Sequence, residues 1–190
     1  DSTGGKEAWN NVKTLSTRYK TDKQGMIIET NTIKKIPAKF FSEVILMGTS
    51  AQKIVFNGTK GSFALFGNAT PIDKTNKLNY IEEYAIIQEV DYLLGAYALT
   101  YKGKNSISNQ EAYTIEVKKP SGKILTEYYS TQSGLKLKSE EWKSTPDLTT
   151  IYATYYENYM PIEEGIKLPH TIKKTGEPNG ITEMTLQNVV

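Results

Sequence analysis

Short segments with the residue pattern of β-strands, separated by turn residues, fill most of this 190-residue chain. Gln24-Gly25 and Asn57-Gly58 are typical of tight hairpin turns between such segments. Short connections favour antiparallel pairing, because parallel neighbours need a long crossover between them. The pattern therefore predicts an antiparallel sheet of about eleven strands. We expect these strands among the segments 16–23, 26–34, 40–47, 52–56, 62–66, 97–102, 111–119, 123–130, 135–142, 149–159, 166–174 and 181–189.

Two segments have helical spacing of their apolar residues instead. The first is 5–15 and the second is 77–90, where a broad apolar stripe indicates a helix with one buried side. A short third helix or turn is expected at 92–95, whereas 67–73, which contains Pro71, is predicted to be a loop. These elements place the chain in the α+β class with two or three helices. The stripe of the second helix consists of Leu78, Ile81, Tyr84, Ala85, Ile87 and Val90.

The composition excludes several classes of protein. The length suits one domain with a sizeable core, and no apolar run approaches the length of a membrane span. Cysteine is absent, which excludes disulfides, thiolate metal sites and cysteine nucleophiles. Arg18 is the only arginine and the net charge is +2, which argues against nucleic-acid binding, because that function relies on arginine.

No set of residues has the spacing that catalysis or metal binding requires. His170 is the only histidine, and it shares strand parity with Ile166 and Leu168, so we expect a half-buried packing residue. The segment 57–62 has glycines and a lysine but lacks the spacing of a phosphate-binding loop. Adjacent acidic residues point apart on a strand or helix, so we interpret three pairs as surface charges. These pairs are Glu82-Glu83, Glu140-Glu141 and Glu163-Glu164. The sequence thus predicts a protein that is not an enzyme and needs no cofactor or metal.

One segment carries apolar residues on both strand faces. In 40–47, one face has Phe41, Ile45 and Met47, and the other has Phe40, Val44 and Leu46. A sheet that is buried on one face alone should alternate apolar with polar residues. Either further structure covers the second face, or an apolar surface is reserved for a ligand or partner. The sequence leaves both alternatives open.

Three blocks of sequence, taken together, resemble a known family. The first block is 4–15, and the second joins Pro37-Ala38-Lys39-Phe40 to the segment 54–61. The third reaches from Ala112-Tyr113 to a closing hairpin that contains Gly165-Ile166-Lys167-Leu168-Pro169-His170. In their order and spacing these blocks are similar to the LolA/LolB-like family of periplasmic lipoprotein carriers.

The resemblance implies a single LolA-like domain over residues 1–190. Its expected fold is a strongly curved antiparallel half-barrel, with the helices covering the concave face and an apolar cavity between sheet and helices. The implied function is to bind or transport a lipidic ligand, such as lipoprotein acyl chains, in the periplasm or cell envelope of a Gram-negative bacterium. The side chains expected to line the cavity are Phe56, Phe63, Leu65, Leu78, Ile81, Tyr84, Ile115 and Val117.

A second hypothesis is an accessory domain that binds another protein and fills its core with its own side chains. The chain has Phe41 and Ser42 where the carriers have an arginine. Its start at Asp1 and its strand-like end at 186–190 fit a domain excised from a larger envelope protein, such as a pitrilysin-like peptidase. Under either hypothesis we expect a lipid or a protein as partner, and neither nucleic acid nor a transmembrane segment.

Overall fold

The computed structural model describes residues 2–92, 95–144, 149–162, 165–176 and 180–190. Within these residues the chain forms thirteen strands and three helices. They fall into two compact units, which we name by their strands. The β1–β6 unit contains residues 10–88 and 184–190, and the β7–β12 unit contains residues 1–9 and 89–183.

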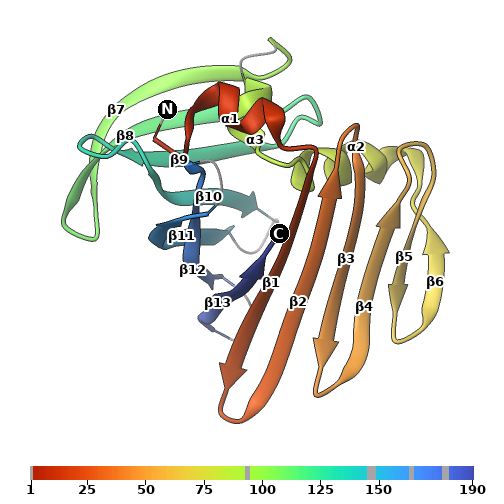
Figure 1. Ribbon diagram of the computed structural model, residues 1–190. Helices are drawn as coiled ribbons and strands as arrows, with labels where there is room; N and C mark the ends of the chain where they lie inside the picture. Colours follow the sequence, from red (N-terminus) through yellow and green to blue (C-terminus); the bar gives the residue numbers. More distant parts are fainter. Residues whose placement is uncertain (1, 93–94, 145–148, 163–164, 177–179) are drawn as a thin grey trace. The chain divides into compact units, whose positions relative to one another are not determined.

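The β1–β6 unit is an antiparallel meander (Figure 1). The last strand of the chain, β13 (Thr182–Val189), pairs with β1, so this sheet contains strands from the first and the last part of the chain. The strand order is β6-β5-β4-β3-β2-β1-β13, and α2 (Lys74–Glu83) follows β6. The bounds are β1 (Thr14–Lys23), β2 (Met26–Lys35), β3 (Lys39–Leu46), β4 (Thr49–Phe56), β5 (Gly61–Leu65) and β6 (Asn68–Pro71).

The β7–β12 unit is a second antiparallel meander, in which each strand pairs with the next along the chain. The start of the chain packs here: Trp9 is buried and its indole Nε1 donates to the Thr3 carbonyl oxygen at 3.1 Å. The bounds are β7 (Ala98–Ile107), β8 (Gln110–Lys118), β9 (Ile124–Ser130), β10 (Lys136–Ser144), β11 (Thr149–Pro161) and β12 (Lys167–Thr175), with α1 (Gly5–Asn11) and α3 (Gln88–Asp91).

The structure confirms the α+β class and the antiparallel pairing, but it corrects the number of strands from about eleven to thirteen. The segment 67–73 is not a loop, because Asn68–Pro71 forms the edge strand β6. Pro71 can occupy the last position of this strand, since an edge strand leaves some of its N–H groups unpaired. The strand is only four residues long, too short for its pattern to be recognised in the sequence.

Both predicted helices are shorter than expected. The first ends at Asn11, so Leu15 belongs to β1, where it is buried. The second is divided into α2 and α3. Side chains satisfy carbonyl groups at the break: Lys34 Nζ donates to the Ala85 carbonyl oxygen at 2.8 Å, and Gln88 Nε2 donates to that of Glu82 at 3.0 Å. Such partners let a helix end without a glycine cap. Part of the predicted turn at 92–95 lies outside the described residues.

The β5–β6 turn generates a prediction about stability. Phe66 and Gly67 have φ angles of 44° and 86°, the combination of a tight hairpin turn that favours Asn-Gly. Phe66 is 68% exposed, so its ring contributes little burial in return for this disfavoured backbone. We expect Phe66→Asn to raise the free energy of unfolding by about 0.5–2 kcal/mol in urea titrations.

The control for this prediction is Ala69→Asn, which places the same side chain in the exposed strand β6. It should not stabilise, because asparagine is disfavoured in strands. A loss of stability in Phe66→Asn would show that the ring makes a contact worth more than the strain of its turn.

Candidate functional site

The helix α2 presents one side to the sheet of the β1–β6 unit. Asp73 caps its first turn, where its carboxylate accepts a hydrogen bond from the Asn76 amide at 2.7 Å. Tyr80, Ile81 and Tyr84 then pack against buried residues of the sheet. Together with residue 77 they follow the i, i+3, i+4, i+7 spacing of one helix face.

The sheet contributes three buried apolar side chains from its middle strands. Phe40 lies at the start of β3, and Ile54 and Phe56 lie near the end of β4. Phe40 and Phe56 are direct partners in the β3–β4 register, and Ile54 faces Phe63 of β5. We call these residues and those packed on them the apolar cluster. Its members are Phe40, Ile54, Phe56, Phe63, Ile72, Tyr80, Ile81 and Tyr84.

Three aromatic rings of this cluster form a stack. The rings of Phe40 and Phe56 are 5.2 Å apart with an angle of 20° between their planes. The rings of Phe40 and Tyr84 are 4.6 Å apart with an angle of 12°. Such pairs contribute about 0.5–1.5 kcal/mol each beyond the area they bury. Since Tyr84 ends α2 and the two phenylalanines belong to the sheet, the stack attaches the helix to the sheet.

The Tyr84 hydroxyl remains neutral inside the cluster. Burial raises the pKa of this phenol, and a hydrogen bond with the Ser42 hydroxyl opposes the rise to a smaller extent. Ser42 is itself buried on the same face of β3 as Phe40. The apolar cluster therefore contains one polar anchor and no charge at its centre.

Gly61 makes the close contact between β5, Phe56 and Ile72 possible. A Cβ atom on Gly61 would lie 2.7 Å from Phe56 Cδ2, 2.8 Å from Ile72 Cδ1 and 2.6 Å from the Val55 carbonyl oxygen. All three distances are shorter than a carbon atom tolerates. The residue type at position 61 is thus dictated by packing in the apolar cluster, since its φ angle is not in the positive region.

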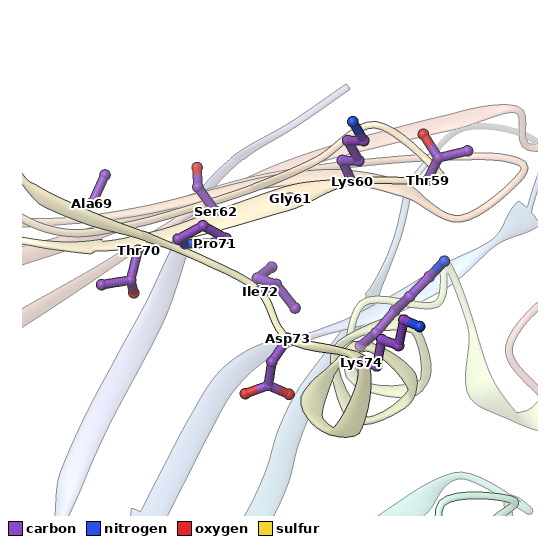
Figure 2. Close-up of a pocket in the computed structure, with 11 residues that line it drawn as sticks. Thr59, Lys60, Gly61, Ser62, Ala69, Thr70, Pro71, Ile72, Asp73 and Lys74 are labelled. Carbon is purple, nitrogen blue, oxygen red and sulfur yellow. The ribbon is translucent and has the colours of Figure 1, made fainter.

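A cavity of about 570 Å³ borders the apolar cluster (Figure 2). Ile72 belongs to both, and Lys77, which lines the cavity, places its ammonium 5.5 Å from the centroid of the Phe56 ring. The cavity combines apolar, hydroxyl and basic side chains, a mixture suited to an amphiphilic ligand. Its lining is Thr59, Lys60, Gly61, Ser62, Ala69, Thr70, Pro71, Ile72, Asp73, Lys74 and Lys77.

A second hollow, of about 530 Å³, lies on the opposite face of β4 and β5. Val55 and Ala64 line it, and they alternate along their strands with Ile54 and Phe63 of the apolar cluster. Unlike the first cavity, which shares Ile72 with the apolar cluster, the second hollow shares none of its lining residues with that cluster. We therefore regard the first cavity as the better candidate site.

The structure brings four of the eight predicted lining residues together. Phe56, Phe63, Ile81 and Tyr84 are members of the apolar cluster. Leu65 and Leu78 are outside it and are 46% and 40% exposed, respectively. The other two, Ile115 and Val117, lie on β8 in the β7–β12 unit. A ligand contact of any of the eight remains a prediction.

Sequence reasoning missed other members of the apolar cluster and the basic lining of the cavity. The predicted stripe on α2 included Leu78, but the face that packs has Lys77 and Tyr80. The prediction failed here because it counted only apolar residues. Lys77 packs through its aliphatic chain and places its ammonium over the Phe56 ring, although lysine is not an apolar residue. Ile72 was missed because its segment was interpreted as a loop.

The β7–β12 unit contains a buried charge cluster, which we also considered as a site. Glu127 is 1% exposed and accepts hydrogen bonds from Tyr92 at 3.0 Å and Tyr129 at 2.6 Å. Lys136 Nζ lies 3.0 Å from Glu127 Oε1 and 2.6 Å from Glu89 Oε1. Burial alone would lower the pKa of Lys136, but the two carboxylates together raise it well above its ordinary value.

This charge cluster is organised for structure. Within the described residues, every buried side-chain nitrogen or oxygen has a hydrogen-bond partner. The ammonium of Lys136 additionally lies over the rings of Tyr129 and Tyr156. A fully paired network of this kind rigidifies a core, whereas the loss of one member leaves a buried charge without compensation.

The remaining candidates for chemistry are the single histidine and the pairs of adjacent acidic residues. His170 is half-buried on β12, as predicted. Glu140 and Glu141 do point apart, toward Lys138 and Lys123 respectively, but the prediction of a surface charge is wrong for Glu82, which is buried. The pair Glu163-Glu164 lies outside the described residues.

The described residues contain neither a cluster of metal ligands nor a helix that could span a membrane. No three or more acidic or histidine side chains there come together as metal ligands would. Over the same residues, no helix has the length and apolar character needed to cross a membrane.

Comparison with known proteins identifies the fold. No protein-family model matches the chain, and no curated protein matches it by sequence. Among solved structures, a DUF1329 family protein from Desulfovibrio piger has a TM-score of 0.64 at 12% identity, over 96% of this chain and 87% of that one. A putative outer membrane lipoprotein-sorting protein domain from Vibrio parahaemolyticus has a TM-score of 0.61 at 12% identity, over 100% and 93%.

A LolA superfamily protein from Nitrosomonas europaea also matches, with a TM-score of 0.58 at 14% identity over 93% of this chain and 83% of that one. The chain therefore has the fold of LolA-superfamily and lipoprotein-sorting proteins, at a distance at which little sequence identity remains. The resemblance drawn from the sequence is confirmed at the level of the fold.

Gly61→Ala tests the packing of the apolar cluster. The added methyl group must displace Phe56, Ile72 or the β4 backbone, so we expect a loss of about 1–3 kcal/mol in the free energy of unfolding. The matched control is Ser62→Ala, one residue further along the same strand, which should change stability by less than about 0.5 kcal/mol. Equal stability of Gly61→Ala and the wild type would contradict the close contact.

Lys136→Met tests the buried charge cluster. It leaves Glu127 without its ammonium, so we expect a loss of about 3–5 kcal/mol in urea or thermal unfolding. Adding Glu127→Gln should restore part of that loss, because it removes the buried charge and keeps an oxygen that can accept from Tyr92 or Tyr129. Lys104→Met, which breaks an exposed ion pair with Glu111, should cost less than about 1 kcal/mol. A similar small effect of Lys136→Met would refute the structural role.

Proposed function

We propose that this protein binds a lipidic ligand without catalysing a reaction. The observation that carries the proposal is the apolar cluster between α2 and strands β3–β5, bordered by a cavity of about 570 Å³ with a mixed apolar and basic lining. An acyl chain that buries a few hundred Å² at roughly 25 cal/mol per Å² would gain several kcal/mol from such a surface.

The comparisons support this proposal through the fold. One similar structure is described as a lipoprotein-sorting protein domain and another as a LolA superfamily protein. By analogy we propose that the ligand is a lipoprotein acyl chain or a chemically similar lipid, and that the protein works in the periplasm or cell envelope of a Gram-negative bacterium. We also propose that the sheet has the half-barrel curvature expected from the resemblance.

Ligand entry requires the cluster to open. Phe40 and Phe56 are almost completely buried, so the space between sheet and helix is occupied by the protein's own rings. Stacked rings can separate without breaking a backbone hydrogen bond, and α2 packs on the sheet through the side chains of Tyr80, Ile81 and Tyr84. We therefore propose that an acyl chain enters from the cavity, next to Ile72, and displaces α2 from the sheet.

An apolar fluorophore tests the proposal. We expect wild-type protein to bind it with a micromolar Kd, about −8 kcal/mol. Ile81→Gln should weaken binding at least tenfold, because Ile81 packs on the apolar cluster and the amide adds a polar group there. The control is Ile124→Gln on β9 of the other unit, where the side chain is exposed and binding should be unchanged.

The same titration separates the carrier from an accessory domain with a permanently filled core. In such a domain the wild type binds no fluorophore, and Ile81→Gln acts on the melting temperature alone. That pair of results would overturn the proposed function.

A further inference from the structure

Five lysines lie at one end of the β1–β6 unit. Successive hairpins of an antiparallel sheet alternate between its two ends, so the β2–β3 and β4–β5 connections and the start of α2 share one end (Figure 1). Two of the lysines flank the β2–β3 connection as the last residue of β2 and the first of β3, one lies in the β4–β5 connection and two belong to α2; we call the five the basic rim. Its members are Lys35, Lys39, Lys60, Lys74 and Lys77.

The basic rim is not neutralised by the protein. None of its lysines forms an ion pair with a carboxylate of the described residues, although lysines elsewhere, such as Lys53 and Lys173, do. The Asp73 carboxylate, which is hydrogen-bonded by the amide and the side chain of Asn76, lines the cavity together with three of the lysines, so positive charge exceeds negative charge there. The surplus of positive charge therefore remains available to an anion from solution.

Two of these lysines are held close together by the backbone. Lys35 and Lys39 are direct partners in the β2–β3 register, an arrangement in which like charges repel. The Lys39 side chain runs beside the β4–β5 turn, because a Cβ on Gly58 would lie 3.7 Å from Lys39 Cγ. That turn also holds Lys60, whose amide donates to Asn57 Oδ1 at 2.9 Å. An anion bound here would relieve the repulsion.

The rim adjoins the cavity described above. Lys60, Lys74 and Lys77 line it, together with hydroxyl groups and the apolar side chains of Pro71 and Ile72 (Figure 2). Ile72 continues into the apolar cluster. The cavity thus combines basic and apolar side chains and shares Ile72 with the apolar cluster, a combination that matches a molecule with an anionic end and an apolar end.

We propose that the basic rim and its cavity bind the phosphate-bearing headgroup of an anionic lipid, whose acyl chain extends past Ile72 to the apolar cluster. This inference rests on the proposed lipid-binding function and adds the chemical class of the headgroup. The same lysines could receive free phosphate, so the experiment distinguishes the two sources of phosphate.

The test compares two single-chain lipids with the same myristoyl chain, lysophosphatidylglycerol and lysophosphatidylcholine, below their micelle concentrations by calorimetry. We expect the anionic lipid to bind at least tenfold more tightly at low salt, and the preference to shrink as salt screens the lysines. In Lys60→Glu/Lys74→Glu the preference should fall below about twofold, with the neutral lipid bound as before.

The control is Lys118→Glu/Lys174→Glu, which makes the same change in net charge at exposed lysines of the β7–β12 unit. It should keep the preference for the anionic lipid.

Equal affinity of the wild type for both lipids, or equal loss of preference in the control, would overturn the headgroup assignment while leaving lipid binding intact. If inorganic phosphate binds as tightly as the anionic lipid, the site recognises free phosphate and not a lipid headgroup. Failure of both lipids and of the neutral fluorophore would instead overturn the proposed function itself.

Discussion

The stack of Tyr84 on Phe40 on Phe56 is the interaction on which the candidate site depends. It joins the end of α2 to two neighbouring strands, and the cavity lies where β6 leads into the same helix. Rings in contact bury area without a directional bond, so they hold the helix firmly and can still part for a ligand of similar polarity. The proposed function requires this combination of attachment and release.

The two units of the chain use different means to build a core. In the β1–β6 unit the centre is apolar, and the lysines stay at its border. In the β7–β12 unit Glu127 is buried against Lys136, whose side chain is 11% exposed, and each buried polar side-chain atom of the described residues has a hydrogen-bond partner. A buried ion pair resists movement of the side chains that form it, because their separation would leave an uncompensated charge in a medium of low polarity. By this reasoning the first unit is suited to admitting a ligand and the second to preserving its structure.

Much of the fold could be predicted from local patterns, and the errors have particular causes. The Gln24-Gly25 hairpin follows from residues adjacent in sequence, and its strands occur as expected. The break between α2 and α3 depends on Lys34, which is distant in sequence and supplies a hydrogen bond to Ala85. Similarly, half of the predicted lining residues belong to the apolar cluster, whereas Leu65 and Leu78 are exposed, because helix phase and strand length decide which side chains face inward.

By itself the sequence determined the antiparallel α+β architecture, the lack of a catalytic motif and the resemblance to lipoprotein carriers, since turn chemistry and residue type are local properties. Only the tertiary structure decided that Lys77 and Tyr80, rather than Leu78, face the sheet. It alone assembled the basic rim, whose lysines come from three separate segments. The physical reason is that chain reversal brings together residues far apart in sequence, and the charge or burial of such a group is a property of their shared surroundings.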